Sequence, residues 1–233
     1  KYNGKEYDSK KGLNWYDYGA RHYDAVLGRF TTNDRFAEKY YSMSPYQYGA
    51  NSPVGNIDVN GDSIIIKPNA NGIIDQIKVL FGYDTKFQKD VKADLFQLKQ
   101  DDKKVADIIG KLEESKNIHY ITMPKKGEYN STGFNADKVK KNISQGTEIY
   151  YNPYNRRRGR NDSDMRTPRI GLAHELQHSF DVDKKVATYE RTKNGILLMD
   201  IRAINTENRI RKVIGEPKRT MYGTQKVPKE LLE

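Results

Sequence analysis

The chain has 233 residues, a formal net charge of +10 and no cysteine. Its mean hydropathy is −0.92, and no run approaches the roughly 20 apolar residues that a helix needs to cross a bilayer, which excludes a membrane span. Without cysteine the chain forms no disulfide and offers no thiolate ligand. Any metal would have to be held by His, Asp or Glu.

Charge and aromatic content divide the sequence near residue 62. Residues 1–62 hold 8 basic and 8 acidic residues, so all of the positive excess belongs to residues 63–233. The first segment also holds 9 of the 17 tyrosines, together with Trp15. We therefore predict a β-rich segment over 1–62 and a larger domain over 63–233.

Aromatic residues between Leu13 and Asp24 recur mostly two positions apart and are followed by turn-forming residues. This spacing predicts short strands and tight turns rather than a helix. The tyrosines would then form a packed face of a sheet. A platform on which nucleic-acid bases stack is the alternative, which the balanced local charge disfavours.

Several short runs of residues in this segment carry a resemblance to a known family: Trp15–Asp24, Gly28-Arg29-Phe30, Asp34, Ser44–Tyr48, Asn51-Ser52-Pro53 and Ile57–Asp62. With them, residues 1–62 resemble the end of the Rhs repeat-associated core. In that family a β-strand shell encloses a variable C-terminal toxin, which is delivered between bacteria or into host cells. The resemblance implies that residues 63–233 are a delivered bacterial effector that acts inside a target cell, with the Rhs shell and a cognate immunity protein as partners.

The family usually carries Asp-Pro-x-Gly at the junction, where many members cut themselves. Here the corresponding residues are Asp58-Val59-Asn60-Gly61, with Val in place of Pro. The resemblance therefore does not extend to the proline of this cleavage motif.

Strands and helices alternate in the first half of the larger domain. Ile64-Ile65-Ile66 predicts a strand, and the Asn71-Gly72 turn signal leads into further apolar residues. Between 86 and 115, apolar residues recur three and four apart among many Lys and Asp, which predicts amphipathic helices. Further strands are predicted at Ile118–Thr122 and Thr147–Tyr151.

The most specific motif is His174-Glu175-Leu176-Gln177-His178. Thr167 is a suitable N-cap and Pro168 a suitable first helical residue, so a helix is predicted to begin there. Histidines four apart project from one face, where both imidazoles can bind a single Zn²⁺. Glu175 between them can reach the attacking water without ligating the metal and is the predicted general base. A surface helix with two unrelated histidines is the alternative.

An open catalytic zinc site needs a third protein ligand. Asp200 and Glu207 lie seven apart in a second predicted helix, bounded by Gly195 and Gly215, and they share one face. We expect one of them to ligate the metal and the other to orient a histidine; the spacing does not choose between them. The other downstream candidates are Asp181, Asp183 and Glu190, of which the first two follow the His helix too closely to fold back over the metal.

Further residues accompany the motif: Ala203, Glu207-Asn208, Arg211, Gly215, Pro217, Arg219 and Tyr222. With them, the block from 145 to 223 resembles effector metallopeptidases related to those that bacterial pathogens inject to cleave host kinases. In that family the first Glu of Glu-x-x-Ala-x-x-x-Glu-Asn-x-x-Arg is the metal ligand, and Asp200 stands at that position here. The predicted fold is α+β, a zincin-like metallopeptidase domain with an active-site helix and a small mixed sheet.

The leading hypothesis is a zinc-dependent endopeptidase toxin that hydrolyses a protein of the target cell. Tyr222, near Arg219, is the candidate for stabilising the oxyanion, with a packed tyrosine as the alternative. The strand predicted at 147–151 is expected to be an edge strand that holds the substrate in extended form. The Arg156–Arg160 cluster is expected to be a solvated loop, or else a contact for an acidic substrate or immunity protein.

Three other activities are weighed against this one. The basic domain would suit a nuclease, but its Lys and Arg are dispersed and no nuclease motif accompanies them, so a nucleic-acid partner is disfavoured. A binding module with a structural zinc would need a closed site of four ligands, usually including cysteine. Amide hydrolysis of a non-protein substrate would use the same site.

Overall fold

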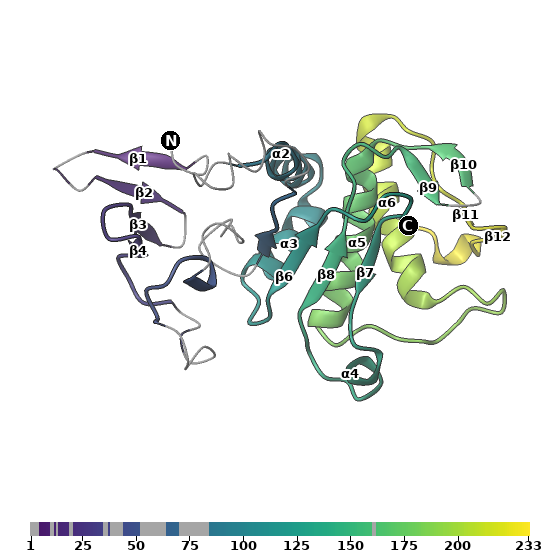
Figure 1. Cartoon of the computed structure of the whole chain (residues 1–233). Coiled ribbons are helices and arrows are strands. Elements are labelled where there is room, and N and C mark those ends of the chain that lie inside the picture. Colours follow the sequence, from purple (N-terminus) through teal and green to yellow (C-terminus); the bar gives the residue numbers. More distant parts are fainter. Residues whose placement is uncertain are drawn as a thin grey trace.

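The computed structural model describes residues 5–9, 12, 14–18, 21–34, 37, 44–51, 64–69, 84–159 and 162–233. Across these residues the protein is a mixed α+β structure, as the sequence predicts, with several small sheets (Figure 1). The predicted boundary at residue 62, the Asp58–Gly61 sequence and the Asn71-Gly72 turn lie outside the described residues. No helix within the described ranges is both long enough and apolar enough to cross a membrane.

The N-terminal segment folds into an antiparallel sheet in which sequential strands pair, as the two-residue spacing predicts. Its buried aromatic residues contact one another with ring centroids 4.9–5.7 Å apart. Tyr18 and Tyr23 are among them, so the prediction that these tyrosines form a packed face is confirmed. The strands are β1 (Glu6–Asp8), β2 (Trp15–Asp17), β3 (His22–Asp24) and β4 (Arg29–Phe30), followed by the short 3₁₀ helix η3 (Gly49–Asn51).

The central sheet has four strands in the order β5-β6-β8-β7, which are Ile64–Ile66, His119–Thr122, Thr147–Tyr150 and Ser131–Gly133. β5, β6 and β8 are parallel, and β7 is antiparallel to β8, with Thr132 opposite Ile149. The prediction that residues 147–151 form an edge strand is wrong, because β7 pairs with the side of β8 that β6 leaves free. Among the described strands, β7 is the edge strand on this side of the sheet, and β5 is the edge strand on the other. The three residues of β7 include one β-branched side chain, too little for a periodic signal.

Helices α2 (Lys86–Asp101) and α3 (Lys103–Glu113) confirm the amphipathic pattern predicted between 86 and 115. Thr85 and Gln88 form a capping box at the start of α2, and Asp102 both ends α2 and caps α3. One apolar core joins these helices to the sheet and to α5, and its fully buried members include Ile66, Leu98, Ile109, Ile121, Ile149 and Leu172.

Helices α5 (Pro168–Asp183) and α6 (Leu198–Ile214) pack against each other, with α5 next to the sheet (Figure 1). Both confirm predicted helices. α5 begins at Pro168, and Gly215 caps the C-terminal end of α6 with a φ of +75°, the left-handed conformation that glycine adopts without strain. Because α5 lies between the sheet and α6, its polar side chains must find buried partners or line a site.

The remaining described elements are short: α4 (Ala136–Lys140), β9 (Arg157–Gly159), β10 (Asp162–Met165), β11 (Met221–Tyr222), β12 (Gln225–Lys226) and the 3₁₀ helix η4 (Lys229–Leu231). β9 and β10 pair antiparallel, as do β11 and β12. The expectation of a loop through Arg156–Arg160 is therefore wrong for residues 157–159, which are held by backbone pairing that side-chain charge does not reveal.

Candidate metal centre

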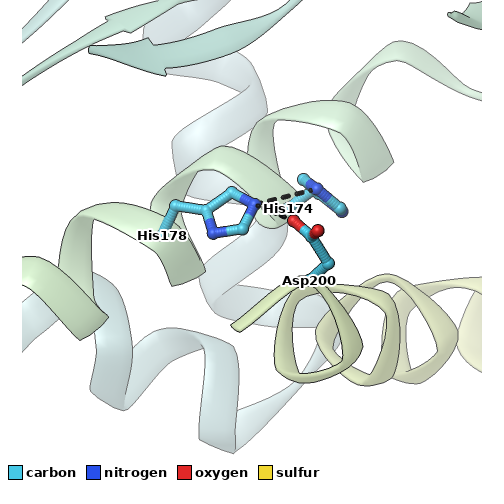
Figure 2. A group of neighbouring side chains, drawn as sticks. All are labelled: His174, His178 and Asp200. Carbon is cyan, nitrogen blue, oxygen red and sulfur yellow. Dashed lines mark hydrogen bonds and ion pairs between the residues drawn. The ribbon is translucent and has the colours of Figure 1, made fainter. Parts of the chain in front are cut away.

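His174 and His178 project from the middle of α5 toward the first turn of α6, which carries Asp200 (Figure 2). The two histidine Nε2 atoms are 3.1 Å apart, and Asp200 Oδ1 lies 3.5 Å from Nε2 of His178. One ligand atom from each of the three residues lies within 4.8 Å of the others. A tetrahedral ion with bonds of 2.0–2.2 Å separates its ligand atoms by about 3.3 Å, so this spacing fits such an ion.

The chemistry of these side chains also fits a metal site. Burial, and then the neighbouring His174, hold the pKa of His178 well below its usual range, which keeps its imidazole neutral. A neutral imidazole is the form that ligates metals. Two imidazoles and a carboxylate suit Zn²⁺, and they suit other divalent transition metals as well.

Burial raises the pKa of Asp200, while His174 and a hydrogen bond with Tyr222 act to lower it. The Asp200 carboxylate is thus desolvated next to two imidazoles. A bound cation would stabilise its charged form.

Glu207 faces the other nitrogen of His174. Its side chain is fully buried, and Oε1 lies 3.0 Å from His174 Nδ1, 2.6 Å from Arg166 Nη1 and 2.8 Å from Arg219 Nη1. Burial opposes ionisation of Glu207, but the two arginines and His174 hold its pKa far below the usual range. Of the two carboxylates that the spacing left open, Asp200 therefore lies with the histidine Nε2 atoms and Glu207 lies behind the His174 ring.

Glu175 directly follows His174 in α5, and its side chain is buried, with 5% of the residue exposed. Thr132 of β7 donates its hydroxyl hydrogen bond to Glu175 Oε2 at 2.8 Å. Burial raises the pKa of Glu175, and His174 and the bond from Thr132 lower it. A carboxylate with a raised pKa is a better base than an exposed one, because it binds a proton more strongly.

A pocket of about 320 Å³ opens beside these residues. Tyr222 of β11 lines it, and burial together with the charge of Asp200 raises the pKa of Tyr222. The phenol is therefore protonated and able to donate at neutral pH. Arg219 stacks near the Tyr222 ring, 5.4 Å from its centroid. The predicted site residues that line this pocket are His174, Glu175, His178, Asp200, Glu207 and Tyr222.

Comparisons with known proteins reach only part of the chain. Salivary gland surface protein 1 of the mosquito Aedes aegypti is 48% identical over 61 residues, which are 26% of this chain. The chain spans 2% of the length of that relative. No family model matches, and no solved structure is significantly similar. These comparisons show no family or activity for the chain.

Asn130, Thr132 and Arg166 are among the pocket residues that sequence reasoning missed. Thr132 lies in strand β7, which the sequence analysis did not predict, and Asn130 directly precedes that strand. Arg166 directly precedes the cap residue Thr167, whose hydroxyl bonds Glu216 rather than the start of the helix. No local pattern marks any of the three, because their partners are distant in sequence.

Proposed function

We propose that the chain is a zinc-dependent endopeptidase with a zincin-like catalytic domain. The observation that carries this proposal is the convergence of both histidine Nε2 atoms and an Asp200 oxygen, with Glu175 buried beside them at the wall of an open pocket. In this proposal His174, His178 and Asp200 ligate the zinc. Glu207 orients His174 through Nδ1, the arrangement that outer-shell carboxylates provide for ligating histidines.

Each side chain then has a defined task. When bound, the zinc ion would supply Lewis-acid polarisation of the peptide carbonyl and of the attacking water. Glu175 would accept the proton of that water and deliver it to the leaving amine. Tyr222, whose single O–H is hydrogen-bonded with Asp200, would leave that carboxylate once it ligates the zinc and would donate to the oxyanion, a role for which its protonated phenol is suited.

The free edge of strand β7 supports the proposal that the substrate is an extended peptide. Asn130, Ser131 and Thr132 line the pocket, and β7 is paired on one side only among the described strands. A substrate strand that adds to the free edge of β7 would pass directly in front of Glu175. This corrected edge strand takes over the substrate-holding role first expected of residues 147–151.

The toxin and effector parts of the proposal rest on the resemblance of residues 1–62 to an Rhs core. In this proposal the parent Rhs polypeptide delivers the domain into a target cell, and a cognate immunity protein protects the producer. The positive excess of residues 63–233 would attract an acidic substrate or immunity protein.

The proposal is tested by mapping new protein termini. The zinc-loaded chain is added to lysates of bacterial and host cells, and mass spectrometry compares termini with those of a lysate treated with chelator. We expect new internal termini that disappear when zinc is removed. Termini that survive chelation, or degradation of DNA or RNA in their absence, would contradict the proposal.

Thr132→Val provides a test of the link between the edge strand and the base. Valine keeps the volume but removes the hydrogen bond that lowers the pKa of Glu175, so that pKa rises. The acidic limb of the pH profile of kcat/KM should move to higher pH, and kcat should fall about tenfold. Thr31→Val makes the same change at a residue outside the pocket lining and also removes one hydroxyl hydrogen bond, so it is the control. An unchanged pH profile in Thr132→Val would show that Thr132 does not act through Glu175.

A further inference from the structure

Two buried arginines in the wall of the pocket share a single carboxylate. Arg166 is 4% exposed and Arg219 is 8% exposed, and among the described residues both bond Glu207 Oε1. A third arginine, Arg211, also lies near Glu207, with its Nε 3.7 Å from Oε2. Arg211 has Glu216 as an additional partner at 3.2 Å. Among the side chains that the structure describes, Arg166 and Arg219 therefore share one carboxylate, which leaves one positive charge at the pocket wall without a carboxylate of its own.

The other acidic residues of the pocket do not balance it. Asp200 belongs to the proposed metal position and Glu175 lines the pocket beside it, where they interact electrostatically with Arg219 and Arg166 respectively. In the proposed zinc-loaded site, the divalent ion would offset the charges of these two carboxylates. A buried charge is costly unless it is paired. A group of opposite charge that enters the pocket with the substrate would supply the missing pair.

The position of Arg166 defines where that group would bind. Its Nη1 bonds Glu207, while its Nη2 lies over Gly171, one turn before His174 on α5. A Cβ atom at residue 171 would lie 2.5 Å from Arg166 Nη2 and 2.6 Å from Asn130 Nδ2. Glycine thus allows both nitrogen groups to converge on the helix at this point.

The side chain of Asn130 is held in a fixed orientation. Its Oδ1 accepts a hydrogen bond from the backbone N–H of Asn152 at 3.1 Å, which turns its NH₂ group toward Arg166 and Gly171. Two neighbouring N–H donors, one of them charged, match the two oxygens of a planar carboxylate. Asn130 directly precedes β7, and Arg166 directly precedes Thr167, the N-cap residue of α5, so the two donors come from different parts of the fold.

We propose that Arg166 and Asn130 form a specificity subsite for an acidic side chain, Asp or Glu, next to the scissile bond of the substrate. This inference rests on the proposed peptidase function and names its substrate class. The site would favour Glu over the isosteric Gln, because only the carboxylate neutralises the spare guanidinium charge. Hydrogen bonds to charged groups of this kind correspond to a preference of about 10- to 100-fold.

Asn130→Asp is the decisive variant. The new carboxylate keeps the acceptor for Asn152 but pairs with Arg166 itself and repels an acidic side chain. The zinc-loaded chain and the variant are given an equimolar peptide library in which matched peptides carry Glu or Gln at one position. We expect the wild type to cleave Glu peptides about 10- to 100-fold faster at one fixed position, and the variant to lose this preference.

Asn142→Asp, which adds the same charge to an exposed residue after α4, should retain the preference. Zinc-dependent cleavage without enrichment of acidic residues would overturn the subsite and leave the peptidase function standing. An equal loss of cleavage for Glu and Gln peptides in Asn130→Asp would also overturn it, because the donors would then contact a backbone group common to both.

A binding measurement separates this inference from catalysis. Zinc-loaded Glu175→Gln protein, which should bind without cutting, is used to capture peptides from the same library, with and without Asn130→Asp. Capture enriched in Glu peptides, and equalised by Asn130→Asp, supports the subsite. Equal capture of Glu and Gln peptides overturns it. If no peptide is cleaved by the unmodified chain, the peptidase proposal fails, and the capture result still decides the subsite.

Discussion

Glu175→Gln is expected to abolish proteolysis and toxicity while the fold and the bound metal persist. Glutamine has nearly the same shape and can still accept the hydrogen bond from Thr132, but it cannot take a proton from water. Loss of general acid–base catalysis lowers rates by about 10²- to 10⁴-fold. The rate of cleavage of a mapped substrate and the growth of cells that express the domain are the measurements.

The unfolding transition separates this effect from misfolding. Burial penalises the charged form of Glu175, so a neutral side chain should leave the unfolding midpoint unchanged or slightly higher. Glu230→Gln, at an exposed position of η4, removes one carboxylate that does not line the pocket and should behave like wild type. Activity within tenfold of wild type in Glu175→Gln would rule out the mechanism.

Asp200→Asn is expected to abolish stable zinc binding by the chain. The neutral amide is a much weaker ligand than a carboxylate, and only two imidazoles would remain. The loss of zinc affinity should exceed the 10- to 100-fold effect that is typical of outer-shell partners. Zinc bound per chain is measured by elemental analysis after dialysis, and affinity by competition with a coloured chelator.

Glu207→Gln is the matched comparison for Asp200→Asn. Its Oε1 already lies within 3.0 Å of two arginine nitrogens and His174 Nδ1, so it is placed to orient the ring rather than to bind the metal. We expect this variant to keep its zinc, with affinity reduced by about 10- to 100-fold. The reverse result, with zinc lost in Glu207→Gln and kept in Asp200→Asn, would make Glu207 the third ligand.

Local patterns are sufficient to predict the long helices α2, α3, α5 and α6 and to place the two histidines of α5 on one face. Apolar spacing of three and four locates α2 and α3, and the capping residues Thr167 and Gly215 mark one end each of α5 and α6. Helices are predictable in this way because their hydrogen bonds and caps join residues within four positions. The same short range places His174 and His178 on one face of their helix.

The choice between Asp200 and Glu207 depends on contacts that no spacing contains. Both lie on one face of α6, so local geometry treats them alike. What separates them is Arg166, 41 residues from Glu207, which holds that carboxylate away from the histidine Nε2 atoms. The edge strand is a similar case, because β7 is recognised by its pairing with β8 rather than by its own three residues.

The sequence alone determined the contrast between the neutral, tyrosine-rich residues 1–62 and the basic residues 63–233, the main helices, and the residue types at the candidate metal centre. The tertiary structure decided which carboxylate faces which nitrogen, that Thr132 supports Glu175 across 43 residues, and that Arg166 lies over Gly171. The physical reason is range. Periodicity and capping act within a turn or two, whereas electrostatic pairing and strand order join residues that come together only when the chain folds.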